Sequence, residues 1–147
     1  MTAFEGEATT VVDAPPDAVY ALVTDVTRTG EWSPECYRAE WLDGATGAQP
    51  GAKFKGWNKQ GFMRWSTKPT VLTAELGKEF SFRTNETVWR YRFEADGGGT
   101  RLTESFEVEK YNALFKIIMP IKRRQAQMIE GMKATIARIK DAAEAKH

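Results

Sequence analysis

The sequence has almost no cysteine or histidine, and this scarcity excludes the commonest catalytic and metal sites. Cys36 is the only cysteine among 147 residues, so neither an internal disulfide nor a cysteine-built zinc site is possible. His147 is the only histidine, and its terminal position makes it a poor general base or metal ligand. Serine triads, Cys-His dyads and histidine-bound metals are therefore excluded, and we expect neither a metal nor a cofactor.

The chain also lacks an excess of either charge and any long apolar run. Its 21 basic and 20 acidic residues give a formal charge of +1, so no global field points to nucleic acid or to a strongly acidic partner. No apolar run approaches the roughly 20 residues that span a bilayer, and the N-terminus shows no signal-peptide pattern. We therefore expect a cytoplasmic protein that does not bind nucleic acid.

Aromatic residues are abundant for a chain of this size. Length and composition, with 41 % hydrophobic and 28 % charged residues, are those of one globular domain, which we expect to span residues 1–147. Phe, Trp and Tyr make up 12 % of the chain. Side chains of this size fill a core or line a pocket.

The first third predicts a strand followed by two short helices. Residues 4–13 alternate apolar and polar positions, which is typical of a half-buried strand. Pro15 and Pro16 end that strand and suit the first turn of a helix. A second short turn carries Trp32, and Pro34 stops it.

The remainder predicts a series of strands and then one long helix. Glycine-rich and polar turns separate the expected strands, which are residues 37–42, 53–59, 64–75, 79–84, 88–95 and 101–109. The segment YNALFKIIM follows as a loop or short helix. From Pro120 onward, one helical stripe carries Ile121, Met128, Met132, Ile136, Ile139 and Ala143.

This order predicts an α+β fold, in which a curved, seven-stranded antiparallel sheet packs its concave face against the long C-terminal helix. Alternation along the strands places most of their aromatic residues on the inner face, while Arg83, Arg90, Arg92 and Arg101 point outward. This separation disfavours a basic, aromatic groove for single-stranded nucleic acid.

Two polar residues share the inner face, namely Asn58 and Glu104. A carboxylate facing an apolar interior is costly unless it is paired, hydrogen-bonded or neutralised. Glu104 therefore either pairs with a basic or amide neighbour or sits near the solvated end of the sheet. Alternatively, it acts with Asn58 as a polar anchor in a ligand pocket, or serves as an acid with raised pKa.

Several motifs together resemble the START-like (SRPBCC) superfamily, specifically its bacterial polyketide cyclase/dehydrase and lipid-transport branch. They are APPDAVYALVTD, EWSP, PGAKFKGWN, RWSTKPTV, VWRYRF, GGGTRLTESFE and the long closing helix, which together cover nearly the whole chain. The resemblance implies a helix-grip fold whose two short helices close one end of a cavity. Members bind sterols, lipids or polyketides, and only some are enzymes.

We therefore predict a protein that binds or carries a small hydrophobic molecule, such as a lipid or a polyketide-like compound. The alternative is a polyketide cyclase or dehydratase that uses Glu104 to move protons and Asn58 to polarise a carbonyl; a third possibility is an interaction protein whose cavity is filled by its own side chains. The predicted ligand-binding residues are Phe54, Asn58, Trp65, Thr67, Phe82, Trp89, Tyr91, Glu104, Phe106, Met128, Met132 and Ile136.

Two features of the closing segment allow more than one interpretation. Lys122, Arg123 and Arg124 follow the apolar YNALFKIIMPI, so this region is either a solvated charge run or a surface that transiently contacts an anionic membrane. Gly131 interrupts the long helix, and a close aromatic neighbour, a bound ligand or neutral drift would each explain it.

Overall fold

The computed structural model describes residues 2–145, so the prediction for His147 lies outside the described residues. In chain order the elements are β1 (Phe4–Val12), α1 (Pro16–Thr24), a 3-10 helix η1 (Val26–Glu31), β2 (Cys36–Trp41), β3 (Phe54–Gln60), β4 (Met63–Thr67), β5 (Thr70–Glu75), β6 (Glu79–Thr84), β7 (Thr87–Asp96), β8 (Gly99–Val108), α2 (Ala113–Ile118) and α3 (Ile121–Glu144). The α+β class and the long C-terminal helix are confirmed.

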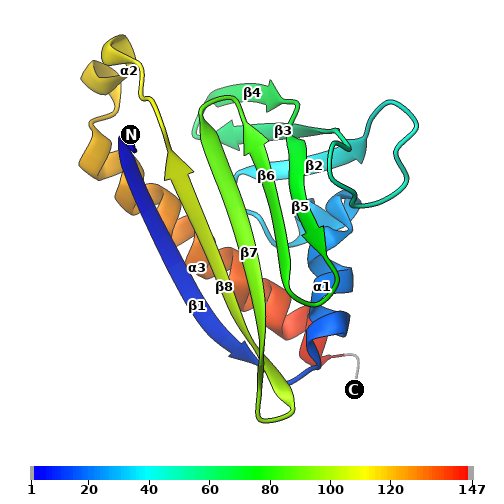
Figure 1. Ribbon diagram of the computed structural model, residues 1–147. Helices are drawn as coiled ribbons and strands as arrows, with labels where there is room; N and C mark the ends of the chain where they lie inside the picture. The colour runs from blue at the N-terminus through cyan, green and yellow to red at the C-terminus, as the bar shows by residue number, and fades with distance from the viewer. Residues whose placement is uncertain (1, 146–147) are drawn as a thin grey trace.

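The strands form two antiparallel sheets rather than one. The larger has the order β1-β8-β7-β6-β5, and the smaller has the order β2-β3-β4. A single bridge between Lys53 and Thr70 links them, and the amide of Val71 donates to the carbonyl of Ala52 beside it. In Figure 1, β2, β3 and β4 turn away from the end of the large sheet, and α3 runs behind the large sheet along its length.

The predicted count of seven strands is wrong, because the expected strand 64–75 is two strands in different sheets. The break falls at Lys68 and Pro69, between β4 and β5. Proline has no N–H to donate to a ladder, which favours an interruption of the strand at this position. The carbonyl of Pro69 instead accepts a hydrogen bond from the amide of Phe54, and the chain crosses here from one sheet to the other.

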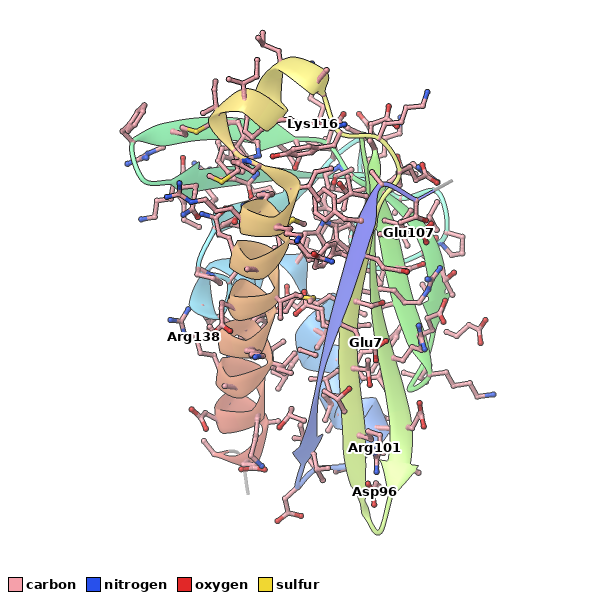
Figure 2. All side chains as sticks on the ribbon, turned by 90° about the vertical axis from the view of Figure 1, so that its left-hand side faces the viewer. Glu7, Asp96, Arg101, Glu107, Lys116 and Arg138 are labelled. Atoms are coloured by element: carbon pink, nitrogen blue, oxygen red, sulfur yellow. The ribbon has the colours of Figure 1, made fainter. Side chains whose placement is uncertain are left out.

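The concave face of the large sheet carries the core, as the alternation predicted. Phe80, Phe93, Leu102 and Phe106 are each at most 3 % exposed. The predicted stripe of α3 covers this face, and all of its members except the half-buried Ile121 are buried. The alternate residues of these strands point to the opposite face, as Figure 2 shows for Glu107, which lies on the side of the sheet away from α3.

A glycine sets how closely α3 approaches β1. A Cβ atom on Gly6 would lie 2.8 Å from Cγ1 of Ile129 on α3 and 2.9 Å from Cε2 of Phe106 on β8. At such distances the neighbouring side chains would have to shift, so the absence of a side chain at Gly6 lets the helix pack closely onto this strand.

The two short helices form where the prolines predict them. Pro16 occupies the first turn of α1, and the Asp25 carboxylate accepts a hydrogen bond from the amide of Thr27 at 3.3 Å to cap η1. Trp32 follows η1 and is 3 % exposed, and the guanidinium of Arg138 on α3 donates to its carbonyl at 3.1 Å. This segment is thereby fixed against the long helix.

No helix within residues 2–145 is long and apolar enough to cross a membrane.

Candidate functional site

A cavity of about 540 Å³ lies between the concave sheet, the segment around η1, β3 and β4, and the face of α3. It extends to one end of the molecule, where Gln60 at the end of β3, Met63 at the start of β4, the β6–β7 turn and the α2 region contribute to its lining. Ligand pockets typically have volumes of about 300 to 1,000 Å³ and mainly apolar walls, so this cavity has room for a small organic molecule.

Most of the predicted site residues come together at this cavity. Ten of the twelve line it, and they are Phe54, Asn58, Trp65, Thr67, Phe82, Trp89, Tyr91, Glu104, Met128 and Met132. Phe106 and Ile136 do not belong to the lining: both are buried in the core, where the Phe106 ring packs 5.5 Å from that of Trp89. These two residues therefore support the wall from behind.

Glu104 is the most unusual group in the cavity. Its side chain extends from β8 on the concave face and is 4 % exposed, and Oε1 has no hydrogen-bond partner among the described residues. No basic side chain pairs with it there, so the predicted ion pair with a basic neighbour is absent. Burial raises the pKa of Glu104 to about 8, although a hydrogen bond with Tyr91 partly opposes the rise. The carboxyl is therefore mainly neutral at pH 7 and able to donate a hydrogen bond.

Tyr91 lies beside Glu104 because β7 and β8 pair these two residues directly across the ladder. Burial raises the pKa of the Tyr91 phenol well above its usual value, and the Glu104 carboxylate raises it further. The phenol thus keeps its proton throughout the physiological range. Two neutral hydrogen-bonding groups, a carboxyl and a phenol, stand next to each other on the sheet side of the cavity.

A second polar group of residues surrounds Gly56 on β3. An added Cβ there would lie 3.4 Å from Sγ of Cys36, 3.4 Å from Oγ1 of Thr67 and 4.0 Å from Nδ2 of Asn58. Register explains the grouping, since Gly56 pairs with Thr67 on β4, and Cys36 on β2 pairs with Asn58. Burial raises the pKa of the Cys36 thiol, so it remains protonated at neutral pH.

An ion pair holds the loop before β2 to the start of α3 at the cavity edge. The Arg124 guanidinium donates to both carboxylate oxygens of Glu35, at 2.7 and 3.0 Å, and the two side chains are only 16 % and 23 % exposed. Both residues belong to the cavity lining. Such bidentate geometry favours a fixed orientation, so this pair sets the distance between the loop and the helix.

Sequence reasoning missed the contribution of the region around α2. Tyr111, Phe115 and Met119 line the cavity, and the Tyr111 hydroxyl donates to the carbonyl of Met119 at 2.8 Å. The Tyr111 ring packs at right angles to those of Phe4 and Phe115. The aromatic residues of YNALFKIIM were a visible signal, but Tyr111 lies in a loop and the six-residue helix α2 is too short for a period to give its inward face.

Trp32 and Cys36 are further lining residues that the predicted set lacked. Trp32 packs at the turn after η1 and also lines the cavity. No group of three or more His, Cys, Asp or Glu residues within the described chain is arranged to hold a metal ion. The donors in the cavity lining are instead hydroxyl, amide, indole, thiol and neutral carboxyl groups, together with the basic side chains of Arg64, Lys110 and Arg124.

A family model described as polyketide cyclase / dehydrase and lipid transport matches residues 3–144 of this chain. The chain belongs to this family. The matched region runs from β1 through α3 and contains all the residues that line the cavity. A comparison with curated protein sequences gives no match.

Solved structures agree with this assignment. A polyketide-cyclase-like protein of Corynebacterium glutamicum is 33% identical, with a TM-score of 0.67, and the match covers 97% of this chain and 92% of that protein. The Zhui aromatase/cyclase of a Streptomyces species is 15% identical with a TM-score of 0.72, covering 97% and 94%. A protein of Thermus thermophilus is 18% identical with a TM-score of 0.77, covering 97% and 99%. The last two share the helix-grip fold with this member of the family.

Proposed function

We propose that this protein binds a small hydrophobic molecule in its internal cavity, with residues 1–147 acting as one ligand-binding domain. The observation that carries the proposal is the buried Glu104 carboxyl, whose Oε1 lacks a partner among the described residues beside a cavity of about 540 Å³. An unsatisfied polar atom in an apolar interior costs roughly 1 to 3 kcal/mol, and a ligand that hydrogen-bonds to it would recover much of that cost.

The chemistry of the cavity defines the class of ligand. A mainly neutral Glu104 and the phenol of Tyr91 favour a carbonyl or hydroxyl group and disfavour a carboxylate, which would lie next to a titratable acid. Aromatic rings and two methionines surround this polar pair and suit a flat or flexible apolar body. A polyketide-like or lipid-like molecule bearing a ketone or hydroxyl group fits both requirements.

A cyclase or dehydratase activity is the second candidate, and the same carboxyl favours it. An acid with pKa about 8 can deliver a proton to a leaving hydroxyl at neutral pH and take one back from an acidic C–H group. The Asn58 side-chain amide donates one long hydrogen bond, of 3.5 Å, to the Gly56 carbonyl, and its second N–H could polarise a ligand carbonyl. The neighbour Zhui is an aromatase/cyclase.

Native mass spectrometry of the protein purified from its own host tests the binding proposal. We expect a mass increment that extraction releases as a small, apolar, oxygen-containing molecule. The variant Gly131→Leu should lose this molecule, because Gly131 lines the cavity and an added Cβ would contact only Pro34, at 3.5 Å. The matched control is Ala137→Leu, which adds the same side chain on an exposed face of α3.

Incubation of the extracted molecule with fresh protein then separates the two candidates. A carrier returns it unchanged, whereas a dehydratase yields a product lighter by one water, and Glu104→Gln should slow that conversion by roughly 10²-fold or more. Recovery of no bound molecule from the wild type, or equal recovery from Gly131→Leu and Ala137→Leu, would argue against the cavity as the binding site.

A further inference from the structure

The basic residues of this nearly neutral chain are concentrated in two segments. Residues 53–68 and 110–124 each contain five lysines or arginines and no acidic residue, so together they hold ten of the 21 basic residues. The rest of the chain therefore has 11 basic residues against 20 acidic ones. A charge of +1 overall conceals a strong separation of charge.

These two segments lie at the same end of the fold, around the mouth of the cavity. They contain β3, β4, α2 and the first turn of α3, and both views place these elements at the top of the molecule (Figures 1 and 2). Lys116 on α2 is labelled at this end in Figure 2. Among residues 2–145, only Arg124 of the ten forms an ion pair with a carboxylate, that of Glu35.

The same end exposes large apolar side chains. Phe62 at the β3–β4 turn is 96% exposed, and Leu114, Ile117 and Ile118 on α2 are 71%, 78% and 69% exposed. None of these four belongs to the cavity lining, whereas Phe115 from the same helix does. The side-chain oxygen Oδ1 of Asn112 caps α2 by accepting from the amide of Leu114 at 2.8 Å.

We propose that Phe62, Leu114, Ile117 and Ile118, with the basic residues around them, form a docking face that binds the surface of an anionic membrane. Apolar side chains flanked by lysine and arginine are the features that hold a protein at a charged bilayer interface. Docking there would turn the mouth of the cavity toward the lipid. The four apolar residues of the docking face lie outside the cavity lining, so this proposal does not depend on what the cavity binds.

Charge favours a membrane over a second copy of this chain. A symmetric dimer through the docking face would bring the same two basic segments of each copy together, and the like charges would oppose association. The apolar side chains also project from two separate segments instead of lining a groove, which suits a fluid apolar layer. Among the carboxylates near this end, Glu35 is paired with Arg124 and Glu109 with Arg83. Glu107 and the exposed Glu86 of the β6–β7 turn form no ion pair within residues 2–145, so the ten basic residues still outnumber these four carboxylates.

Co-sedimentation of the full-length protein with vesicles tests the proposal. Vesicles made of equal parts phosphatidylglycerol and phosphatidylcholine should bind the wild type at low salt, and pure phosphatidylcholine vesicles should bind it roughly tenfold or more weakly. Phe62→Asp and Ile117→Asp should each reduce binding by roughly tenfold or more. Lys116→Glu combined with Lys122→Glu should have a similar effect, and the remaining binding should fall further as salt rises.

Leu76 and Lys78 provide matched controls at the other end of the fold. Leu76 is 67% exposed in the turn between β5 and β6, and Lys78 is also exposed. Leu76→Asp and Lys78→Glu introduce the same chemical changes, and we expect vesicle binding to stay within about twofold of the wild type.

Three outcomes would overturn the proposal. They are equal binding to anionic and neutral vesicles, equal losses in the docking-face and control variants, and light scattering that shows a wild-type dimer dissociated by Phe62→Asp. Circular dichroism of each variant checks that it is folded. Retention of the cavity ligand by Ile117→Asp, measured by native mass spectrometry, separates a failure of docking from a failure of cavity binding.

Discussion

Replacing Glu104 with glutamine should remove a pH-dependent cost from the folded state. In the unfolded chain the carboxyl ionises with a pKa near 4.5, whereas burial raises its pKa in the folded protein to about 8. Between these values the unfolded state has released a proton that the folded state still holds. The free energy of unfolding therefore falls as pH rises across this window, and it becomes constant above the folded pKa.

The size of the effect follows from the shift in pKa. At about 1.4 kcal/mol for each pKa unit, the displacement corresponds to roughly 3 to 5 kcal/mol between about pH 5 and about pH 8. Glutamine has nearly the same shape and no titratable proton. We therefore expect the free energy of unfolding of Glu104→Gln, relative to that of the wild type, to increase by about 1 kcal/mol for each pH unit across this range.

Urea unfolding followed by circular dichroism at several pH values measures this difference. The control is Glu7→Gln, which removes an exposed carboxylate from the neighbouring strand β1 and lies on the outer side of the sheet (Figure 2). The difference between Glu7→Gln and the wild type should change little over the same window. If the free-energy difference between Glu104→Gln and the wild type does not vary with pH, Glu104 is ionised in the folded protein, and its pKa is not raised by burial.

Three further substitutions test the packing around the cavity. Gly6→Ala should lower the free energy of unfolding by about 1 to 3 kcal/mol, because its Cβ would overlap α3 and β8; urea unfolding would show no loss if the helix moves freely. Gly131→Ala should instead raise it by up to about 1 kcal/mol, since a Cβ fits there and alanine favours a helix, and a lower midpoint would contradict this. Trp32→Ala should cost about 3 to 5 kcal/mol, measured as a lower thermal midpoint, and a change under about 1 kcal/mol would show that the ring is dispensable.

Much of the fold was predictable because alternation and helical spacing depend on the sequence itself. The inner parity of β6, β7 and β8 was assigned correctly, and the predicted stripe of α3 is buried except at the half-buried Ile121. The split at Pro69 was missed, although proline was a signal for it, because an apolar and polar alternation continues on both sides. Only the hydrogen-bond partners of the backbone assign the two halves to different sheets.

The lining of the cavity was predictable to the extent that it lies on regular strands and on α3. Ten residues chosen by parity and helical spacing line the cavity, whereas Phe106 and Ile136, chosen by the same rule, lie in the core. Alternation along a strand shows which face of the sheet a residue occupies, but it does not show how far that residue lies from the helix that covers the face. For residues in loops, such as Tyr111 and Trp32, no period exists from which to infer direction.

The sequence by itself determined the strands, the long helix and the presence of a carboxyl on an inner face. Tertiary structure decided what that carboxyl meets: Tyr91 comes beside Glu104 through the register of β7 and β8, and no basic group within the described chain neutralises it. The clustering of positive charge at one end also depended on β3, β4 and α2 converging in space. Local patterns report a residue's face, but contacts between segments distant in sequence arise only when the chain packs.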